Sequence, residues 1–246
     1  MHRYQILIEY VGTNFHGWQI QNKNQSIQNV IQIKISRLLK EKINLVGSGR
    51  TDAGVHAIEQ SAHFDCKNLI ENLDKFIQSV NFFLNKKLIS IINIKKKNLN
   101  FHSRFSAKQR IYKYIIFNRA STPSIDRYRG WHIRKKLNLK LMKMGAKKLL
   151  GTNDYSTFRS SSCSAKSPIK TIKSIRVIKK KNKVEIKFQS QSFLQQQVRS
   201  MVGCLKYLAE GKWDIKKFEK TFKSKKRILC APPAPPHGLF LEKIIY

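Results

Sequence analysis

The sequence predicts an α+β protein that is built from two similar halves. Strand-like apolar segments alternate with segments of helical spacing, and the order strand–helix–strand occurs twice, over residues 1–106 and 107–246. No low-complexity linker separates these two stretches. A chain of 246 residues that is 41% hydrophobic can bury a full core. We therefore expect two pseudo-equivalent halves whose sheets face each other or join across a central cleft.

The first half is expected to begin with a strand and to return to strands after each of two helices. Ser26 is a good N-cap, and apolar residues recur after it with helical spacing as far as residue 39. A second amphipathic pattern covers residues 73–84. The expected strands are residues 4–10, 44–46, 60–66 and 88–94, and the lysine-rich stretch 95–98 is expected to be a connector.

The second half repeats this alternation and ends on a strand. Its expected strands are residues 110–118, 171–179, 184–191 and 239–246, and its expected helices are residues 139–150, 193–209 and 214–222. Gly151 is expected to end the first of these helices, and residues 151–168 to form a long serine-rich loop. Residues 180–182 predict a hairpin turn, and the proline-rich run 232–236 predicts a rigid turn before the last strand.

The charge of the chain predicts a polyanionic partner. There are 49 basic and 14 acidic residues, so that the formal net charge is +35 and the pI is about 10.3. Nucleic acid is the first candidate for such a partner. The alternative is a solvated basic surface without a cognate ligand, because the abundance of Ile, Lys and Asn is also typical of an AT-rich coding sequence. Arginines at special positions therefore carry more weight than scattered lysines.

The four cysteines favour a reduced, cytoplasmic protein without a structural metal. Cys66, Cys163, Cys204 and Cys230 are widely dispersed, and they form neither a CxxC pair nor a spacing with His that is typical of zinc. The N-terminus lacks the pattern of a signal peptide, and no uncharged apolar run reaches the length of a membrane span.

A glycine-rich segment around Asp52 is the first candidate for a catalytic site. Gly47, Gly49 and Gly54 fall within eight residues, which indicates unusual backbone angles or close approach of another backbone. Between them lies Arg50-Thr51-Asp52, in a chain with few acids. Asp52 is a candidate nucleophile or base. The alternative is a hairpin in which its side chain only caps the turn.

Three further features are candidates for the same site. Phe101-His102-Ser103-Arg104-Phe105 interleaves aromatic rings with positive charge, which suits unstacked nucleotides but is equally compatible with core phenylalanines beside an ion pair. Tyr112 is either functional or a half-buried strand residue that shares a face with Tyr114. Arg199 lies within an apolar helical pattern, where a guanidinium needs an anionic partner, and Asp52 is a reasonable one.

These residues lie in motifs that resemble a known family. The stretch around Asp52, Gly49-Arg50-Thr51-Asp52-Ala53-Gly54-Val55-His56-Ala57, is similar to the catalytic motif of the TruA family of tRNA pseudouridine synthases. Further matches follow in the family's order at residues 12–19, 101–105, 110–114, 153–159, 198–203 and 238–241. The likeness therefore spans nearly the whole chain.

The resemblance implies both a fold and an activity. The fold would be pseudouridine synthase-like, with two ferredoxin-like α/β halves and mostly antiparallel sheets around a central cleft. The catalytic Asp would lie in the half 1–106, and the stacking Tyr and pairing Arg in the half 107–246. The activity would be isomerisation of uridine to pseudouridine at positions 38, 39 and 40 of the tRNA anticodon stem-loop. The family also implies a homodimer that needs no metal, nucleotide or redox cofactor.

The resemblance also implies a role for each candidate residue. Asp52 would be the nucleophile and would attack either uracil C6 or ribose C1′. Tyr112 would stack on the flipped base and assist removal of the proton from C5, and Arg199 would pair with Asp52 and hold the pocket open. The implied RNA contacts are Arg50, Tyr112, Phe101, His102, Ser103, Arg104, Phe105, Ser162, Cys163, Ser164, Ala165, Lys166 and Leu239. Two departures from the family are Gln195-Gln196-Gln197, where a His or Met is usual, and a longer proline-rich run at 232–236.

General chemistry is compatible with this activity and leaves two others open. The isomerisation is neutral overall, so one carboxylate suffices as nucleophile and leaving group, and a neighbouring arginine would favour its ionised form. A base in a stem has to be flipped out before it can react. The alternatives are a non-catalytic RNA-binding protein or chaperone, and an RNA hydrolase, which would need a second group to activate water.

Overall fold

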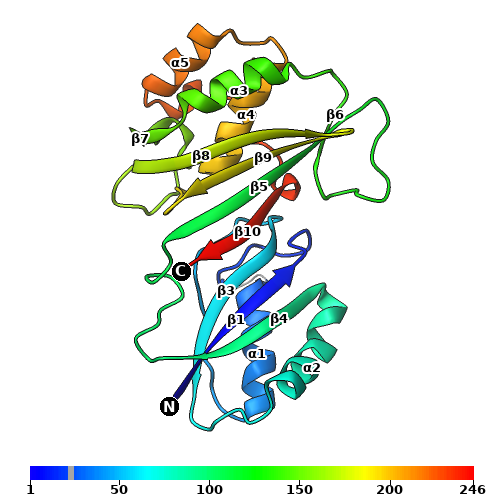
Figure 1. The fold of residues 1–246 in the computed structure, drawn as a ribbon, viewed down its shortest axis with the longest axis vertical. Helices are drawn as coiled ribbons and strands as arrows, with labels where there is room; N and C mark the ends of the chain where they lie inside the picture. The colour runs from blue at the N-terminus through cyan, green and yellow to red at the C-terminus, as the bar shows by residue number, and fades with distance from the viewer. Residues whose placement is uncertain (22–24) are drawn as a thin grey trace. The chain divides into compact units, whose positions relative to one another are not determined.

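The computed structural model describes residues 1–21 and 25–246, and these divide into two compact units. Unit 1 consists of Met1–Lys108 together with Leu241–Tyr246, and unit 2 consists of Gln109–Phe240. Each unit combines helices with a mostly antiparallel set of strands (Figure 1). The predicted α+β class is confirmed. Within the described residues, no helix is long and apolar enough to cross a membrane.

Unit 1 is a sheet with two helices that pack against each other. Its elements are β1 (His2–Tyr10), α1 (Ile27–Leu39), β2 (Val46–Gly47), β3 (His56–Cys66), α2 (Leu73–Leu84), a 3-10 turn (Asn85–Lys87), β4 (Ile89–Lys97) and most of β10 (Leu239–Ile245). The strand order is β4-β1-β3-β10, with β2 paired to β3. Strand β1 runs antiparallel to both β3 and β4, and Ile6 and Ile8 on it are fully buried.

Unit 2 repeats the combination of sheet and helices. Its elements are β5 (Gln109–Asn118), β6 (Trp131–Ile133), α3 (Leu139–Lys148), β7 (Gly151–Asp154), β8 (Ile169–Lys180), β9 (Lys183–Ser190), α4 (Gln197–Ala209), α5 (Ile215–Lys223) and three 3-10 turns (Ser156–Phe158, Arg227–Leu229, Pro236–Gly238). The strand order is β5-β9-β8-β7, and β6 pairs with β5 in parallel. Helices α3 and α4 pack closely because Gly145 leaves room for Leu208.

Side-chain caps explain why four helices begin where they do. Ser26 accepts the N–H of Asn29 at the start of α1, and Asn72 accepts that of Lys75 at the start of α2. Asn138 and Asp214 cap α3 and α5 in the same way. These bonds satisfy N–H groups that a helix leaves without an internal partner. The predicted starts of these helices agree with the structure to within one residue.

Three predictions of local structure are wrong. The helix expected over 193–209 begins only at Gln197, because Gln196 has a φ of 61° and so cannot continue a right-handed helix. The stretch 151–168 is not one loop, since Gly151–Asp154 pairs with β8 as strand β7. The lysines at 95–97 belong to β4, where they pair with residues 3–5 of β1, instead of forming a connector.

The C-terminal segment returns to the first unit. The Tyr246 hydroxyl donates to the Ser103 carbonyl at 2.9 Å and lies 2.7 Å from the Ser61 hydroxyl, and the Lys108 N–H donates to the Ile245 carbonyl. Compact unit 1 therefore contains residues 241–246, whereas the boundary expected from the sequence placed everything after residue 106 in the second half.

Candidate active site

Asp52 lies on the loop that connects β2 to β3 in unit 1, where its side chain is half-buried. The preceding Thr51 is buried: its hydroxyl lies 2.8 Å from that of Tyr10, and its carbonyl accepts the N–H of Trp18 at 3.1 Å. The Asp52 carbonyl accepts the N–H of Val55 at 3.2 Å, which closes a tight turn. The backbone on both sides of the carboxylate is thus held by hydrogen bonds.

A second loop packs directly against this turn because two of its residues are glycines. Gly17 has a φ of +90°, and a Cβ added there would lie 2.6 Å from the Thr51 carbonyl oxygen. A Cβ on Gly12 would overlap the carbonyl oxygen of Val55. Because neither glycine has a side chain, the backbone of residues 12–18 lies against that of residues 51–55, which positions Asp52.

Gln60 of β3 holds the start of the same loop by hydrogen bonds. Its side chain is fully buried, its Oε1 accepts the Ser48 hydroxyl at 2.8 Å, and its Nε2 donates to the Gly49 carbonyl at 2.9 Å. Arg50, which follows Gly49, is exposed, and its Nε donates to Gln19 Oε1 at 3.2 Å. Gln60 therefore holds the backbone next to Arg50 while the guanidinium stays accessible.

The segment 101–105 joins the base of this loop through Ser103. Ser103 is fully buried, and its hydroxyl donates to the carbonyl of Val46 in β2 at 2.6 Å. Phe101 packs on Tyr246 at 4.9 Å between ring centroids. Phe105 is 76% exposed, and the neighbouring Arg104 is exposed as well. The segment thus divides into a buried anchor and an accessible pair of one cation and one aromatic ring.

Buried His63 beneath this anchor is held in its neutral form. Burial, followed by the positive charge of Arg3 and the neighbouring His102, lowers the pKa of His63 to about 4. Its Nδ1 lies 2.8 Å from Ser103 Oγ and 3.2 Å from the Ser103 backbone nitrogen, so the ring contacts Ser103 directly. Arg3 in turn is paired with Asp65, with Nε 2.7 Å from Oδ1.

In unit 2, Tyr112 lies on β5 and is 8% exposed. The Tyr112 ring packs edge-to-face on the ring of Phe193, with ring centroids 5.3 Å apart and ring planes at 90°. Two residues further on, the Tyr114 hydroxyl donates to the Pro235 carbonyl at 2.8 Å. Tyr112 is therefore positioned by the strand and by one aromatic neighbour from the segment before α4.

Arg199 lies in the first turns of α4, and its backbone and side chain both bind the proline-rich run. Its Nε donates to the Ala234 carbonyl at 2.8 Å, and its own carbonyl accepts the Ala234 N–H at 3.0 Å. Gly203, one turn later, allows the Pro232 carbonyl to approach the helix. The long run 232–236 thus packs on α4 and fixes the orientation of the half-buried Arg199 side chain.

The loop 159–166 is closed on itself by Arg159. The guanidinium donates to the carbonyls of Cys163 and Ala165 at 2.7 and 2.9 Å. Burial alone would raise the pKa of the Cys163 thiol, but the N–H groups of Ala165 and Gln195 and the charge of Arg159 outweigh it and lower that pKa. The exposed residues of this loop include Ser162, Ser164 and Lys166.

Backbone bonds bring this loop next to the turn that precedes α4. The Ser160 N–H donates to the Gln195 carbonyl at 3.1 Å, and Gln197 Oε1 accepts the N–H of Leu194 at 2.7 Å. The glutamine run that departs from the family therefore forms a hydrogen-bonded turn between Phe193 and Arg199, although the buried Gln197 Nε2 has no hydrogen-bond partner among the described residues. Leu239, which opens β10, is buried, and its exposed fraction is 5%.

Sequence reasoning missed three supporting residues. Tyr10 and Gln60 hold the Asp52 loop, and Phe193 packs on Tyr112. The position of Gln60 in a strand gave a weak indication, since a polar side chain that faces the core needs hydrogen-bond partners. Across the residues that the structure describes, no group of three or more His, Cys, Asp or Glu could hold a metal ion.

Comparison with known proteins gives a consistent result. The sequence profile of the tRNA pseudouridine synthase family matches residues 6–106 and 146–246. A tRNA pseudouridine synthase A from Pelagibacter ubique is 71% identical over 246 residues, which is all of both chains. Proteins of the same description from Parvibaculum lavamentivorans and Paramagnetospirillum magneticum are each 39% identical over this whole chain, covering 100% and 96% of their own lengths.

The chain therefore belongs to the tRNA pseudouridine synthase family, which is a family of isomerases. The predicted membership of the TruA family is confirmed by the full-length relatives, and the two separate profile matches agree with the predicted pair of similar halves. A solved structure of a Cbf5-Nop10-Gar1 complex aligns over 82% of this chain and 53% of the matched chain, with 11% identity and a TM-score of 0.34. This similarity is too low to support a conclusion.

Proposed function

We propose that this chain isomerises uridine to pseudouridine at positions 38, 39 and 40 of the tRNA anticodon stem-loop, with Asp52 as the nucleophile. The observation that carries the proposal is the Asp52 turn, in which a half-buried carboxylate is held by hydrogen bonds and by the close approach of residues 12–18. The full-length similarity to tRNA pseudouridine synthases supports the substrate, and the resemblance to TruA supports the positions.

The reaction needs one nucleophile and one proton acceptor. The Asp52 carboxylate attacks uracil C6 or ribose C1′, the bond between N1 and C1′ breaks, and the base turns. A bond then forms between C5 and C1′, the carboxylate is released, C5 loses its proton and N1 gains one. Tyr112 stacks on the flipped base and assists removal of the C5 proton, while Arg199 pairs with the carboxylate and favours its ionised form.

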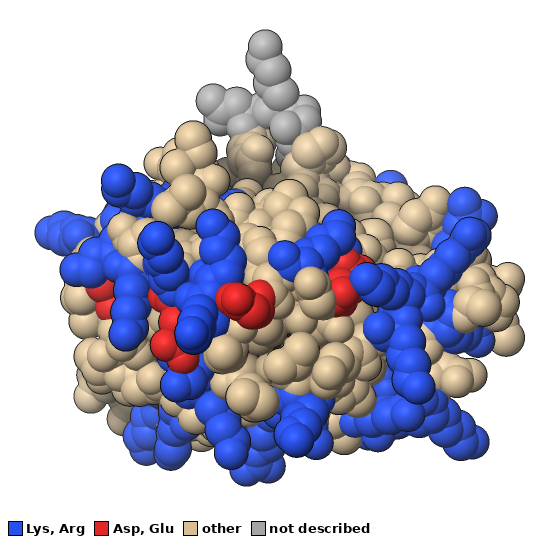
Figure 2. All heavy atoms as spheres, turned by 90° about the horizontal axis from the view of Figure 1, so that it is seen from above, with Lys and Arg blue, Asp and Glu red and all other residues tan. Residues whose placement is uncertain are grey.

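The RNA contacts come from accessible side chains of both units. Exposed Arg50, Arg104 and Phe105 provide charge and one stacking ring in unit 1, and Lys166 provides charge in unit 2. The proposed RNA contacts also include Phe101, His102, Ser103, Ser162, Cys163, Ser164, Ala165 and Leu239. Of these, Ser103, Cys163 and Leu239 are buried. Figure 2 shows many Lys and Arg side chains on one face of the molecule, with few acids among them.

The active form that we propose is a cytoplasmic homodimer that the tRNA crosses. Size-exclusion chromatography with light scattering on active enzyme tests this proposal, and we expect twice the chain mass of 28.7 kDa. An active form that stays at the mass of one chain would contradict it.

The decisive experiment is the substitution Asp52→Asn. We expect the variant to bind tRNA as the wild type does and to lose pseudouridine formation by about 10⁴-fold or more, because the nucleophile is removed. Chemical mapping of pseudouridine on bulk tRNA measures activity, and filter binding measures affinity. Asp74→Asn, an exposed acid on α2 with the same charge change, is the control and should stay active.

The same assays separate the alternatives. If Asp52→Asn retained full activity, Asp52 would not be the nucleophile. A wild-type protein that binds tRNA without forming pseudouridine would be a non-catalytic RNA-binding protein. Release of free uracil or cleaved RNA, detected by mass spectrometry, would identify a hydrolase.

A further inference from the structure

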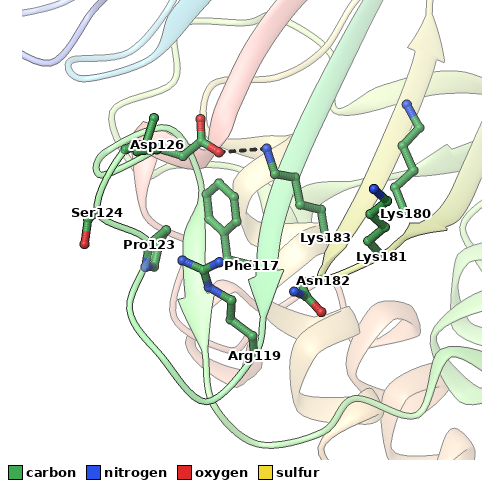
Figure 3. Close-up of a pocket in the computed structure, with 10 residues that line it drawn as sticks. Phe117, Arg119, Pro123, Ser124, Asp126, Lys180, Lys181, Asn182 and Lys183 are labelled. Carbon is green, nitrogen blue, oxygen red and sulfur yellow. Dashed lines mark hydrogen bonds and ion pairs between the residues drawn. The ribbon is translucent and has the colours of Figure 1, made fainter.

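A basic pocket of about 610 Å³ lies in unit 2, where β5 ends beside the β8–β9 hairpin. Its lining includes four cationic side chains and one acidic one (Figure 3): Arg119, Lys180, Lys181 and Lys183, with Asp126. Asp126 is already engaged, since its Oδ2 lies 2.8 Å from Lys183 Nζ. Lys180 is ion-paired as well, with its Nζ 3.0 Å from Glu185 Oε2, so the excess positive charge of the pocket rests on Arg119 and Lys181.

Hydrogen bonds tie both walls of the pocket to neighbouring backbone. Arg119 Nε donates to the Ser121 carbonyl at 2.9 Å, and the Arg119 carbonyl pairs with His132 Nε2 at 2.9 Å. On the opposite wall the hairpin turn is joined to β5 by a bond from the Asn118 N–H to the Asn182 carbonyl at 2.9 Å. The cations are therefore carried by an ordered frame.

The floor of the pocket is apolar. Phe117 lies under the Lys183 ammonium, which is 5.0 Å from the ring centroid, and Pro123 is buried beside it. At the rim, Ile125 is completely exposed. Such a pocket suits an RNA strand. The uncharged sugars can lie against the apolar floor, and the negatively charged phosphates can bind the cations at the rim.

The pocket is separate from the position proposed for the flipped uridine. Strands rise about 3.3 Å per residue, so Phe117 lies roughly 17 Å from Tyr112 along β5. One nucleotide at Tyr112 cannot fill both places.

We propose that this pocket is a second RNA-binding site, which takes backbone phosphates of the tRNA at a point away from the nucleotide that is isomerised. The inference rests on the proposed function, because that function identifies tRNA as the polyanion that the pocket binds. Phosphate contacts of this kind fix the register of a bound RNA without reading its sequence. The site would therefore help to place the anticodon stem-loop.

The test compares two double variants that remove the same charge from unit 2. One is Lys180→Gln with Lys181→Gln in the pocket, and the other is Lys216→Gln with Lys220→Gln on the exposed face of α5. Direct tRNA binding is measured as a function of salt concentration, together with thermal unfolding. We expect the pocket variant to bind about ten- to a hundredfold more weakly at 0.1 M salt, with a salt slope smaller by about 1.4–1.8, and the α5 variant to change little.

The outcomes are distinguishable from failure of the proposed function. Equal losses in the two variants, or no loss in either, would overturn the pocket proposal while pseudouridine formation by the wild type stays intact. A changed oligomeric mass in the pocket variant would overturn it too, because the pocket would then be a contact between copies. Lys180→Arg with Lys181→Arg retains the charge and should restore both affinity and slope. If wild-type protein binds through the pocket but forms no pseudouridine, only the proposed function fails.

Discussion

The residues proposed for catalysis are held in two different ways in the two units. In unit 1, Asp52 lies on an irregular loop, and contacts between two backbones position it, with glycines at residues 12 and 17 making them possible. In unit 2, Tyr112 and Arg199 lie on a regular strand and a regular helix, and they are oriented by a ring contact with Phe193 and a bond to the Ala234 carbonyl.

This difference explains why one site is conspicuous in the sequence and the other is not. A loop that is packed backbone against backbone requires glycine at given positions, so it leaves a dense local motif. A side chain on a strand or helix takes its direction from the regular element and requires only that its neighbours fit. Consequently we expect a small change of backbone shape to lower the rate of pseudouridine formation more in unit 1 than in unit 2. In unit 2 we expect the rate to fall mainly when the functional group itself is removed.

The largest effect after Asp52 is expected for Tyr112→Phe in unit 2. The ring and its contact with Phe193 remain, whereas the phenol group is lost, so tRNA binding should persist while the turnover rate falls by about 10²- to 10⁴-fold. Single-turnover kinetics with saturating enzyme measure the rate.

Tyr155→Phe is the matched control for this prediction. Tyr155 is also buried in unit 2, and its hydroxyl donates to the Leu149 carbonyl at 2.8 Å. Its removal should lower the free energy of unfolding by about 1 kcal/mol and leave the rate unchanged. Full activity in Tyr112→Phe would remove the proposed proton role and leave only stacking.

A smaller effect is expected for Gly17→Ala in unit 1. The added methyl group would meet the Thr51 carbonyl oxygen at 2.6 Å and would displace the Asp52 turn. A displacement of about 1 Å can cost about 10²-fold in rate, so we expect a loss of that order. Kinetics of pseudouridine formation and thermal unfolding should be measured together.

Gly211→Ala is the control that separates the clash with the Asp52 turn from the strain of a positive φ. Gly211 also has a positive φ, at +75°, but a Cβ there would meet nothing within 4 Å. It should cost about 1 kcal/mol of stability through strain alone, with normal activity. Equal rate losses in both variants would show that backbone contact does not position Asp52.

The smallest effect concerns the acid stability of unit 1. The pKa of His63 is about 4 in the folded protein and about 6.5 when unfolded, so between these values the unfolded chain binds more protons. Stability should therefore fall as the pH drops from 6.5 to 4, by an amount on the order of 2 kcal/mol. Urea unfolding at a series of pH values measures it. His63→Gln cannot titrate there, and an undiminished pH dependence in that variant would place the effect elsewhere, for example at Asp65 or His102.

Much of the secondary structure followed from local patterns. The caps at Ser26 and Asp214 and the hairpin of β8 and β9 involve residues that are close in the chain, so their chemistry is visible in the sequence. The start of α4 was misjudged because the apolar spacing continues through Phe193 and Leu194, whereas the backbone at Gln196 adopts a left-handed conformation. The spacing of apolar residues indicates which side chains face the core. A single residue with positive φ ends a helix without changing that spacing.

The sequence by itself determined the α+β class, the positions of most helices with the cap at Ser26, and the identity of Asp52 as the exceptional acid of a glycine-rich loop. Only the tertiary structure decided that Gly17 contacts the Thr51 carbonyl, that Gln60 supports Gly49, that Tyr246 returns to Ser61, and that Phe117 and Lys183 meet in a basic pocket. The physical reason is that a cap or a turn joins residues a few positions apart, whereas these contacts join segments that come together only when the sheet pairs and the core excludes water.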